Sequence, residues 1–209
     1  MEKKTIIAIS REFGSGGRLI GKKLAEKLGV KFYDKDLIEL TARRSGLSPD
    51  FIETAEQHAT NSFLYTIAAS ANAGGNYIFN YNAPVADKAF FAQSSVIRDL
   101  AKADSCVIVG RCAGYILRDD PACVSIFLHA SLDSRLNRCI NEYGLEAKGL
   151  ADKLTKTDKA RANYHRYYTG ERWDDLRAYD LVLSTTKLTV DAAVDIIYEY
   201  LENRTHGQA

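Results

Sequence analysis

A glycine-rich turn near the amino terminus has the clearest potential for chemistry. Gly14, Gly16 and Gly17 follow an isoleucine-rich run at residues 5–10 and precede an amphipathic segment at 19–28. Glycines at this density allow positive φ and close backbone approach, so successive amide N–H groups can converge on phosphate oxygens. The amino end of the following helix adds about half a positive charge. The pattern predicts a phosphate-binding turn between a buried strand and a helix.

The turn departs from the common phosphate-loop pattern G-x-x-x-x-G-K-[ST]. When the pattern is anchored on Gly17, its lysine falls on Arg18 and its first glycine on Glu12. An arginine still neutralises phosphate charge and can bind it through two parallel hydrogen bonds. The hydroxyl that would bind a metal is replaced by Leu19, which has no ligand atom. We therefore expect any Mg²⁺ to be held by the nucleotide, by water and by another carboxylate.

Further charged residues follow other apolar runs that we interpret as strands. Asp34 and Asp36 come after a short run at 31–33, and Arg111 follows the run at 106–109. Ligands of open parallel sheets bind at the carboxyl ends of the strands. Two roles stay open for the aspartates: capping the next helix, or holding substrate or metal-bound water, for which Asp34 is the better candidate. Arg111 either contacts a phosphate, which its position favours, or pairs with a carboxylate.

Apolar runs and helical patterns alternate along the chain. We expect strands at 5–10, 31–33, 106–109, 124–128 and 181–183, and helices at 19–28, 37–44, 87–103, 132–142, 151–166 and 190–203. Ser48 and Pro49 begin a further helix, and Thr189 caps the last one. This alternation predicts a parallel sheet with helices on both faces.

Two segments differ in composition from the rest. Residues 60–86 carry no charged side chain but several aromatic residues. This composition is typical of an insert that lies over a cleft or a partner, and equally of a packed helical hairpin. Residues 135–172 hold nine Lys or Arg against five Asp or Glu. Such charge runs are usually solvated helix faces, but opposite a phosphate cradle a basic flap supplies cations to a transferring phosphoryl group. We expect the aromatic residues near the end of this segment to pack at the hinge of the basic flap rather than to stack on a nucleotide base.

Length and composition exclude several classes of protein. The 209 residues suit one domain, and 46% hydrophobic with 26% charged residues is ordinary globular composition. A net charge of +1 gives no sign of a nucleic-acid partner. No apolar stretch approaches the length of about 18 residues that a membrane span needs. The four cysteines form no Cys-x-x-Cys pair and suit free thiols, so we expect a cytoplasmic protein.

Several motifs, in order along the chain, resemble the cytidylate kinase-like family. They are Ile-Ala-Ile-Ser-Arg-Glu-Phe-Gly-Ser-Gly-Gly-Arg at 7–18, Phe-Tyr-Asp-Lys-Asp-Leu-Ile at 32–38, Val-Ile-Val-Gly-Arg-Cys-Ala at 107–113, Lys-Thr-Asp-Lys-Ala-Arg at 156–161 and Tyr-Asp-Leu-Val-Leu-Ser-Thr-Thr at 179–186. The resemblance implies an α/β P-loop NTPase fold: a doubly wound, five-stranded parallel sheet in one domain over 1–209. It also implies an insert that binds the nucleoside monophosphate, at about 45–87, and a basic lid at about 135–175.

The implied reaction is transfer of the γ-phosphoryl group of ATP to CMP or dCMP, with Mg²⁺ as companion ion. The expected partners are small nucleotides, and a homodimer through the uncharged insert stays open. The roles implied for this sequence fall into three groups. Gly14, Ser15, Gly16, Gly17, Arg18, Leu19, Thr185 and Lys187 would bind ATP; Asp34, Arg111, Asp158 and Arg161 would bind the acceptor; and Arg18, Arg135, Arg138 and Arg161 would act on the transferring group.

This sequence also departs from the family pattern. Cys112 replaces an aspartate after Gly-Arg, Leu154 stands where a lid arginine is expected, and Val109 replaces an acid at the end of a strand. Two alternatives therefore stay open. The first is a kinase of the same fold for another small acceptor, and the second is a nucleotide-binding regulator without catalysis.

Overall fold

The computed structural model describes residues 4–54 and 85–204. Five parallel strands form one sheet in the order β2-β3-β1-β4-β5. The strands are β1 (Ile6–Arg11), β2 (Lys31–Tyr33), β3 (Cys106–Val109), β4 (Cys123–His129) and β5 (Leu181–Ser184). The predicted five-stranded, doubly wound α/β fold is confirmed, and the carboxyl ends of the strands meet at one edge of the sheet.

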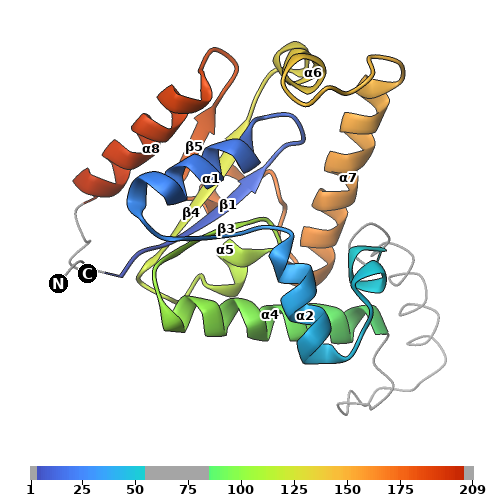
Figure 1. The fold of residues 1–209 in the computed structure, drawn as a ribbon, viewed down its shortest axis with the longest axis vertical. Helices are drawn as coiled ribbons and strands as arrows, with labels where there is room; N and C mark the ends of the chain where they lie inside the picture. Colours follow the sequence, from blue (N-terminus) through green and yellow to red (C-terminus); the bar gives the residue numbers. More distant parts are fainter. Residues whose placement is uncertain (1–3, 55–84, 205–209) are drawn as a thin grey trace.

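Helices cover both faces of the sheet (Figure 1). They are α1 (Gly17–Leu28), α2 (Asp36–Ser45), α4 (Val85–Ala103), the short α5 (Ala113–Ile116), α6 (Leu132–Asn141), α7 (Leu150–Thr169) and α8 (Val190–Asn203). Residues 49–54 are also helical, and a 3₁₀ turn spans Leu176–Ala178. No helix within the described parts of the chain is long and apolar enough to cross a membrane.

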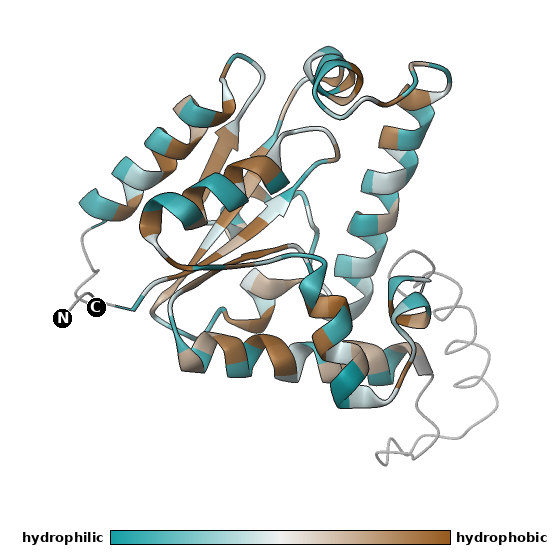
Figure 2. Cartoon of the chain, viewed as in Figure 1, coloured by the Kyte–Doolittle hydropathy of each residue, from teal (hydrophilic) through white to brown (hydrophobic). Residues whose placement is uncertain are grey.

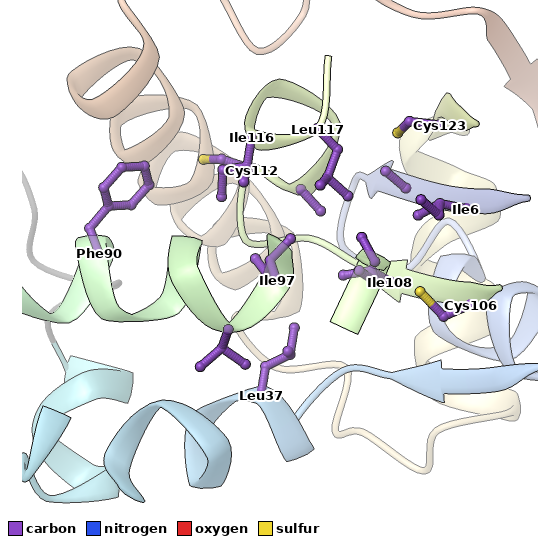
Figure 3. Close-up of a cluster of buried hydrophobic side chains, with 14 of the residues drawn as sticks. Ile6, Leu37, Phe90, Ile97, Cys106, Ile108, Cys112, Ile116, Leu117 and Cys123 are labelled. Atoms are coloured by element: carbon purple, nitrogen blue, oxygen red, sulfur yellow. The ribbon is translucent and has the colours of Figure 1, made fainter. Parts of the chain in front are cut away.

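Alternation along β1 divides the core into two layers. Ile7 and Ile9 face α1 and α8, whereas Ile6 and Ala8 face α2, α4 and α5. Figure 3 shows the second layer, where Leu37 and Ile97 approach the buried side chains of the strands. In Figure 2 the strands are largely hydrophobic and the outer faces of α1 and α8 are hydrophilic. A sheet buried on both sides holds the loops at its carboxyl edge on a rigid base.

Most expected elements agree with the structure to within a few residues at their ends. Thr189 caps α8, since its hydroxyl accepts a hydrogen bond from the amide of Ala192 at 3.2 Å. The prediction that Asp34 or Asp36 caps α2 is wrong, because the residue at the cap is Lys35 and no side chain caps the helix. The predicted insert falls mostly outside the described residues, as does the tail at 205–209.

Candidate functional site

The glycine-rich turn links β1 to α1 at the carboxyl edge of the sheet. Gly14 and Gly16 adopt φ of 82° and 87°, a conformation that side chains with a Cβ disfavour. Gly16 precedes the first residue of α1, so the first amides of that helix, which have no partner within it, lie at the turn. This arrangement supplies the amide donors and the helix dipole that the glycine pattern predicts.

A pocket of about 490 Å³ opens beside this turn. Its wall includes the turn from Ser10 to Leu19 except Ser15, the ends of β2 and β3 through Asp34 and Arg111, and α7 through Arg161. A volume of this size is typical of small-molecule sites. The pocket therefore joins a phosphate-binding turn to charged residues from three other elements.

Arg18 and Asp34, both predicted site residues, are paired in this pocket. The Nε of Arg18 lies 2.8 Å from Oδ2 of Asp34, while the Arg18 side chain is 64% exposed. The carboxylate is nearly buried and also lies 4.0 Å from Nη2 of Arg11. Asp34 thus pairs with arginines at the strand end, and its predicted role in holding substrate or metal-bound water stays a prediction.

The predicted lid aspartate holds the turn from the side of α7. The amide of Phe13 donates a 2.7 Å hydrogen bond to Oδ1 of Asp158, whose Oδ2 accepts a 2.6 Å bond from Arg135. Burial raises the pKa of the Asp158 carboxyl, although these bonds and Arg161 act in the opposite direction. The same Arg135 nitrogen lies 3.2 Å from Glu12. Asp158 therefore couples α7 to the turn.

Two predicted site residues lie behind the turn: Arg138, expected to act on the transferring group, and Thr185, expected to bind ATP. Arg138 is buried and donates to the carbonyl oxygens of Gly14 at 2.9 Å and Thr185 at 3.4 Å. Thr185 is 1% exposed, and its hydroxyl donates to the carbonyl of Ser15 at 2.7 Å. None of Arg135, Arg138, Thr185 and Lys187 is among the residues that line the pocket. In this structure Arg135, Arg138 and Thr185 brace the turn.

This geometry makes a specific prediction for Arg138→Ala. Removing the guanidinium would leave two buried carbonyl oxygens without that donor, at about 1–3 kcal/mol each. We expect the free energy of unfolding to fall by about 2–4 kcal/mol in urea titrations. Arg172→Ala serves as the control, since Arg172 forms an exposed pair with Asp174 and should change stability by less than about 1 kcal/mol. A variant with unchanged stability but reduced kcat would instead assign Arg138 to the transferring group.

Arg111 occupies an unusual backbone segment at the end of β3. Gly110, Arg111 and Cys112 have consecutive positive φ values of 81°, 59° and 55°. Non-glycine residues in this conformation concentrate at functional sites. Burial lowers the pKa of Arg111 and raises that of the Cys112 thiol to about 12, so Cys112 is a neutral thiol rather than a replacement for an acid. Leu154 is buried against Cys139 and Leu150 and has a core role.

The glycine pattern did not identify Arg11 or Glu12 as functional. Arg11 lines the pocket, and its carbonyl accepts a 3.1 Å hydrogen bond from Arg161. Glu12 accepts a 3.0 Å hydrogen bond from the amide of Ala130. Their position at the end of β1, next to the turn, was the available signal.

The carboxylates around the pocket do not form a metal site. Asp34 pairs with Arg18, while Asp158 and Glu12 both pair with Arg135. Across residues 4–54 and 85–204, no three His, Cys, Asp or Glu side chains are grouped to hold a metal ion. These described residues therefore build no all-protein cage for Mg²⁺. Any Mg²⁺ would arrive with the nucleotide, held mainly by phosphate oxygens and water.

Comparisons with known proteins agree with this geometry. Residues 6–187 match the cytidylate kinase-like family. A cytidylate kinase of Pyrobaculum aerophilum is 31% identical over 200 residues, covering 93% of this chain and 91% of that protein. A cytidylate kinase of Pyrococcus horikoshii is 24% identical and covers 93% of this chain and 86% of its own.

Solved structures show the same architecture. A protein from Eubacterium ventriosum has a TM-score of 0.70 at 32% identity, over 96% of this chain and all of its own. A shikimate kinase from Bacteroides thetaiotaomicron has a TM-score of 0.55 at 16% identity, over 95% and 98% of the two chains, which shows the P-loop kinase fold alone. The chain belongs to the cytidylate kinase-like family and is an ATP-dependent phosphotransferase of the nucleoside monophosphate kinase type.

Proposed function

We propose that the chain transfers the γ-phosphoryl group of ATP to CMP or dCMP. The observation that carries this proposal is the pocket in which the glycine-rich turn lies opposite Arg111 and Asp34. The turn offers amide donors for a polyphosphate, and Arg111 offers a cation for the acceptor phosphate. The relatives from Pyrobaculum aerophilum and Pyrococcus horikoshii are named cytidylate kinases, which favours a cytidine nucleotide as the acceptor.

Catalysis in this proposal rests on positioning and electrostatics. An oxygen of the acceptor phosphate forms a bond to the γ-phosphorus, while the bond from that phosphorus to the β,γ-bridging oxygen breaks and leaves its electron pair on ADP. Arg161 reaches the pocket from α7. Burial lowers the pKa of its guanidinium because the cation is partly desolvated. A phosphoryl group with spreading negative charge is stabilised by such a preorganised cation. No protein nucleophile is required.

The acceptor residues would act before the chemical step. Arg111 would fix the acceptor phosphate at the end of β3, while Asp34 would orient the acceptor or a water. We propose that α6 and α7 form the lid, closing over both nucleotides and excluding water, so that ATP is not simply hydrolysed. The hydrogen bond that Asp158 accepts from the amide of Phe13, and the ion pair of Arg135 with Glu12, couple that lid to the turn.

An acceptor screen tests this proposal. The purified chain is incubated with ATP and Mg²⁺ and with each of CMP, dCMP, UMP, AMP and GMP, and with small hydroxylated acids as non-nucleotide acceptors. Products are separated by anion-exchange chromatography. We expect CDP and dCDP to form with the highest kcat/KM. Turnover confined to another acceptor would contradict the cytidylate assignment. The other acceptors are included because Cys112 stands where the family pattern has an aspartate. ATP binding without transfer to any acceptor would indicate a regulator.

A further inference from the structure

The structure gives a different register for the phosphate-loop pattern from the one that the glycines suggest. That pattern runs from the end of a strand into the first turn of a helix. Here β1 ends at Arg11 and α1 begins at Gly17. When the pattern's second glycine is placed on Gly16, its first glycine falls on Arg11 and its lysine on Gly17. The two exchanges, glycine to arginine and lysine to glycine, then occur at the two ends of one turn.

Packing links these two positions directly. A Cβ atom at Gly17 would lie 2.6 Å from Cβ and 2.8 Å from Cγ of Arg11. Real Cβ atoms do not approach other carbon atoms so closely, so the stem of Arg11 occupies the space that a side chain at residue 17 would need. The glycine at 17 therefore makes room for an arginine that starts from residue 11.

The guanidinium of Arg11 ends between the turn and the acceptor side of the pocket. It passes against Gly110, where a Cβ atom would collide with Nη1 of Arg11. Its Nη2 lies 4.0 Å from Oδ1 of Asp34, and its side chain is 19% exposed. Gly110 and Asp34 lie at the ends of neighbouring strands. The cation thus lies where a terminal phosphate held by the turn would approach an acceptor.

The charge of Arg11 is incompletely balanced in the structure. Its nearby carboxylate, Asp34, is bound more closely by Arg18 at 2.8 Å. Burial, together with repulsion from Arg161 and Arg111, lowers the pKa of Arg11 to about 9 against the opposing effect of Asp34 and Asp158. A bound polyanion would relieve both the repulsion and the lost hydration. Arg18, by contrast, is mostly exposed and already paired.

We propose that Arg11, rather than Arg18, is the cation that binds the terminal phosphates of ATP, in the role that the pattern's lysine has elsewhere. The inference rests on the proposed function in taking ATP as the ligand. It reassigns the phosphate-bridging role from the first turn of α1 to the last residue of β1.

Calorimetric titration with a non-hydrolysable ATP analogue and Mg²⁺ tests the inference on the full chain. We expect Arg11→Ala to weaken binding by about tenfold or more, as for a lost charge-assisted hydrogen bond. The matched control, Arg18→Ala, should change affinity by less than about threefold. Thermal unfolding of both variants without ligand checks that they fold. Equal affinity in Arg11→Ala and the parent chain, or a larger loss in Arg18→Ala, overturns the inference.

A paired exchange provides a second test that does not rest on a loss of binding alone. Gly17→Lys in the parent chain should bind the analogue poorly, because the new stem meets Arg11. In the double variant Arg11→Gly/Gly17→Lys the space is free and the common pattern is restored. We expect its affinity to exceed that of Arg11→Gly by about tenfold. A double variant that binds no better than Arg11→Gly contradicts the inference.

The two proposals fail in different ways. If the parent chain binds the ATP analogue and Arg11→Ala binds it equally well, the role of Arg11 is wrong while the kinase proposal stands. If the parent chain binds no triphosphate, the proposed function itself is wrong.

Discussion

Gly16→Ala will weaken binding of ATP by at least about tenfold, while Gly29→Ala leaves it unchanged. The two glycines flank α1 and both adopt positive φ, 87° at Gly16 and 66° at Gly29. Each substitution costs about 1–2 kcal/mol of backbone strain. At Gly16 the added methyl group and the altered backbone disturb the amides that would hold phosphate, and at Gly29 nothing lies within 4 Å of the new Cβ.

Calorimetry with ATP and thermal unfolding of both variants check this expectation. Similar losses of stability establish that the strain is matched, and the difference in affinity then reports on the turn alone. Gly16→Ala with the ATP affinity of the parent chain would show that the turn does not bind the triphosphate.

Arg161→Ala will lower kcat by about 10³-fold, within the range of roughly 10³–10⁵ known for arginines that stabilise phosphoryl transfer. Arg161 extends from α7 into the pocket, and its guanidinium lies 5.6 Å from the ring centre of Phe13 and donates to the carbonyl of Arg11. In the proposed function, a cation in this place would meet the transferring group when both nucleotides are bound. Affinity for ATP should change much less than kcat, because the expected contact develops with charge in the transition state.

Steady-state kinetics with the best acceptor measures this effect, and Arg166→Ala is the matched control. Arg166 is exposed on the same helix, so its loss changes the net charge of α7 equally without reaching the pocket. Arg161→Lys keeps the charge but not the forked geometry and should recover only part of the activity. Equal kcat values for Arg161→Ala and Arg166→Ala would remove Arg161 from the chemical step.

The fold was largely predictable because its determinants are local. The continuous apolar run of β1 and the helical spacing in α8 are visible in the sequence. Thr189 marks the start of α8, where its hydroxyl accepts a hydrogen bond from the amide of Ala192. The order of strands in the sheet is set by packing between distant segments. The sequence patterns predict no strand order; the resemblance to a family supplied only the doubly wound character of the sheet.

The candidate site was only partly predictable from residue types. The sequence predicts the turn, Asp34, Arg111 and Arg161 at one site, and in the structure they line one pocket. It could not show that Arg138 turns to the carbonyl of Gly14, since those residues are 124 positions apart. It also missed Arg11, because only packing shows which strand-end side chain fills the space above Gly17.

Side chains near β5 illustrate the same limit. A hydroxyl such as that of Thr185 is equally suited to a nucleotide base and to a backbone carbonyl. The structure places it on the carbonyl of Ser15, inside the protein. The choice depends on how closely β5 approaches the turn, which no local pattern encodes.

A crystal structure of the chain with a bisubstrate analogue, in which a polyphosphate joins adenosine to cytidine, tests the central claim most directly. We expect the phosphates to lie along the amides of 14–18, pass Arg11, and reach Arg111, with the cytidine beyond Arg111. A polyphosphate bound elsewhere, with the turn empty, would contradict it.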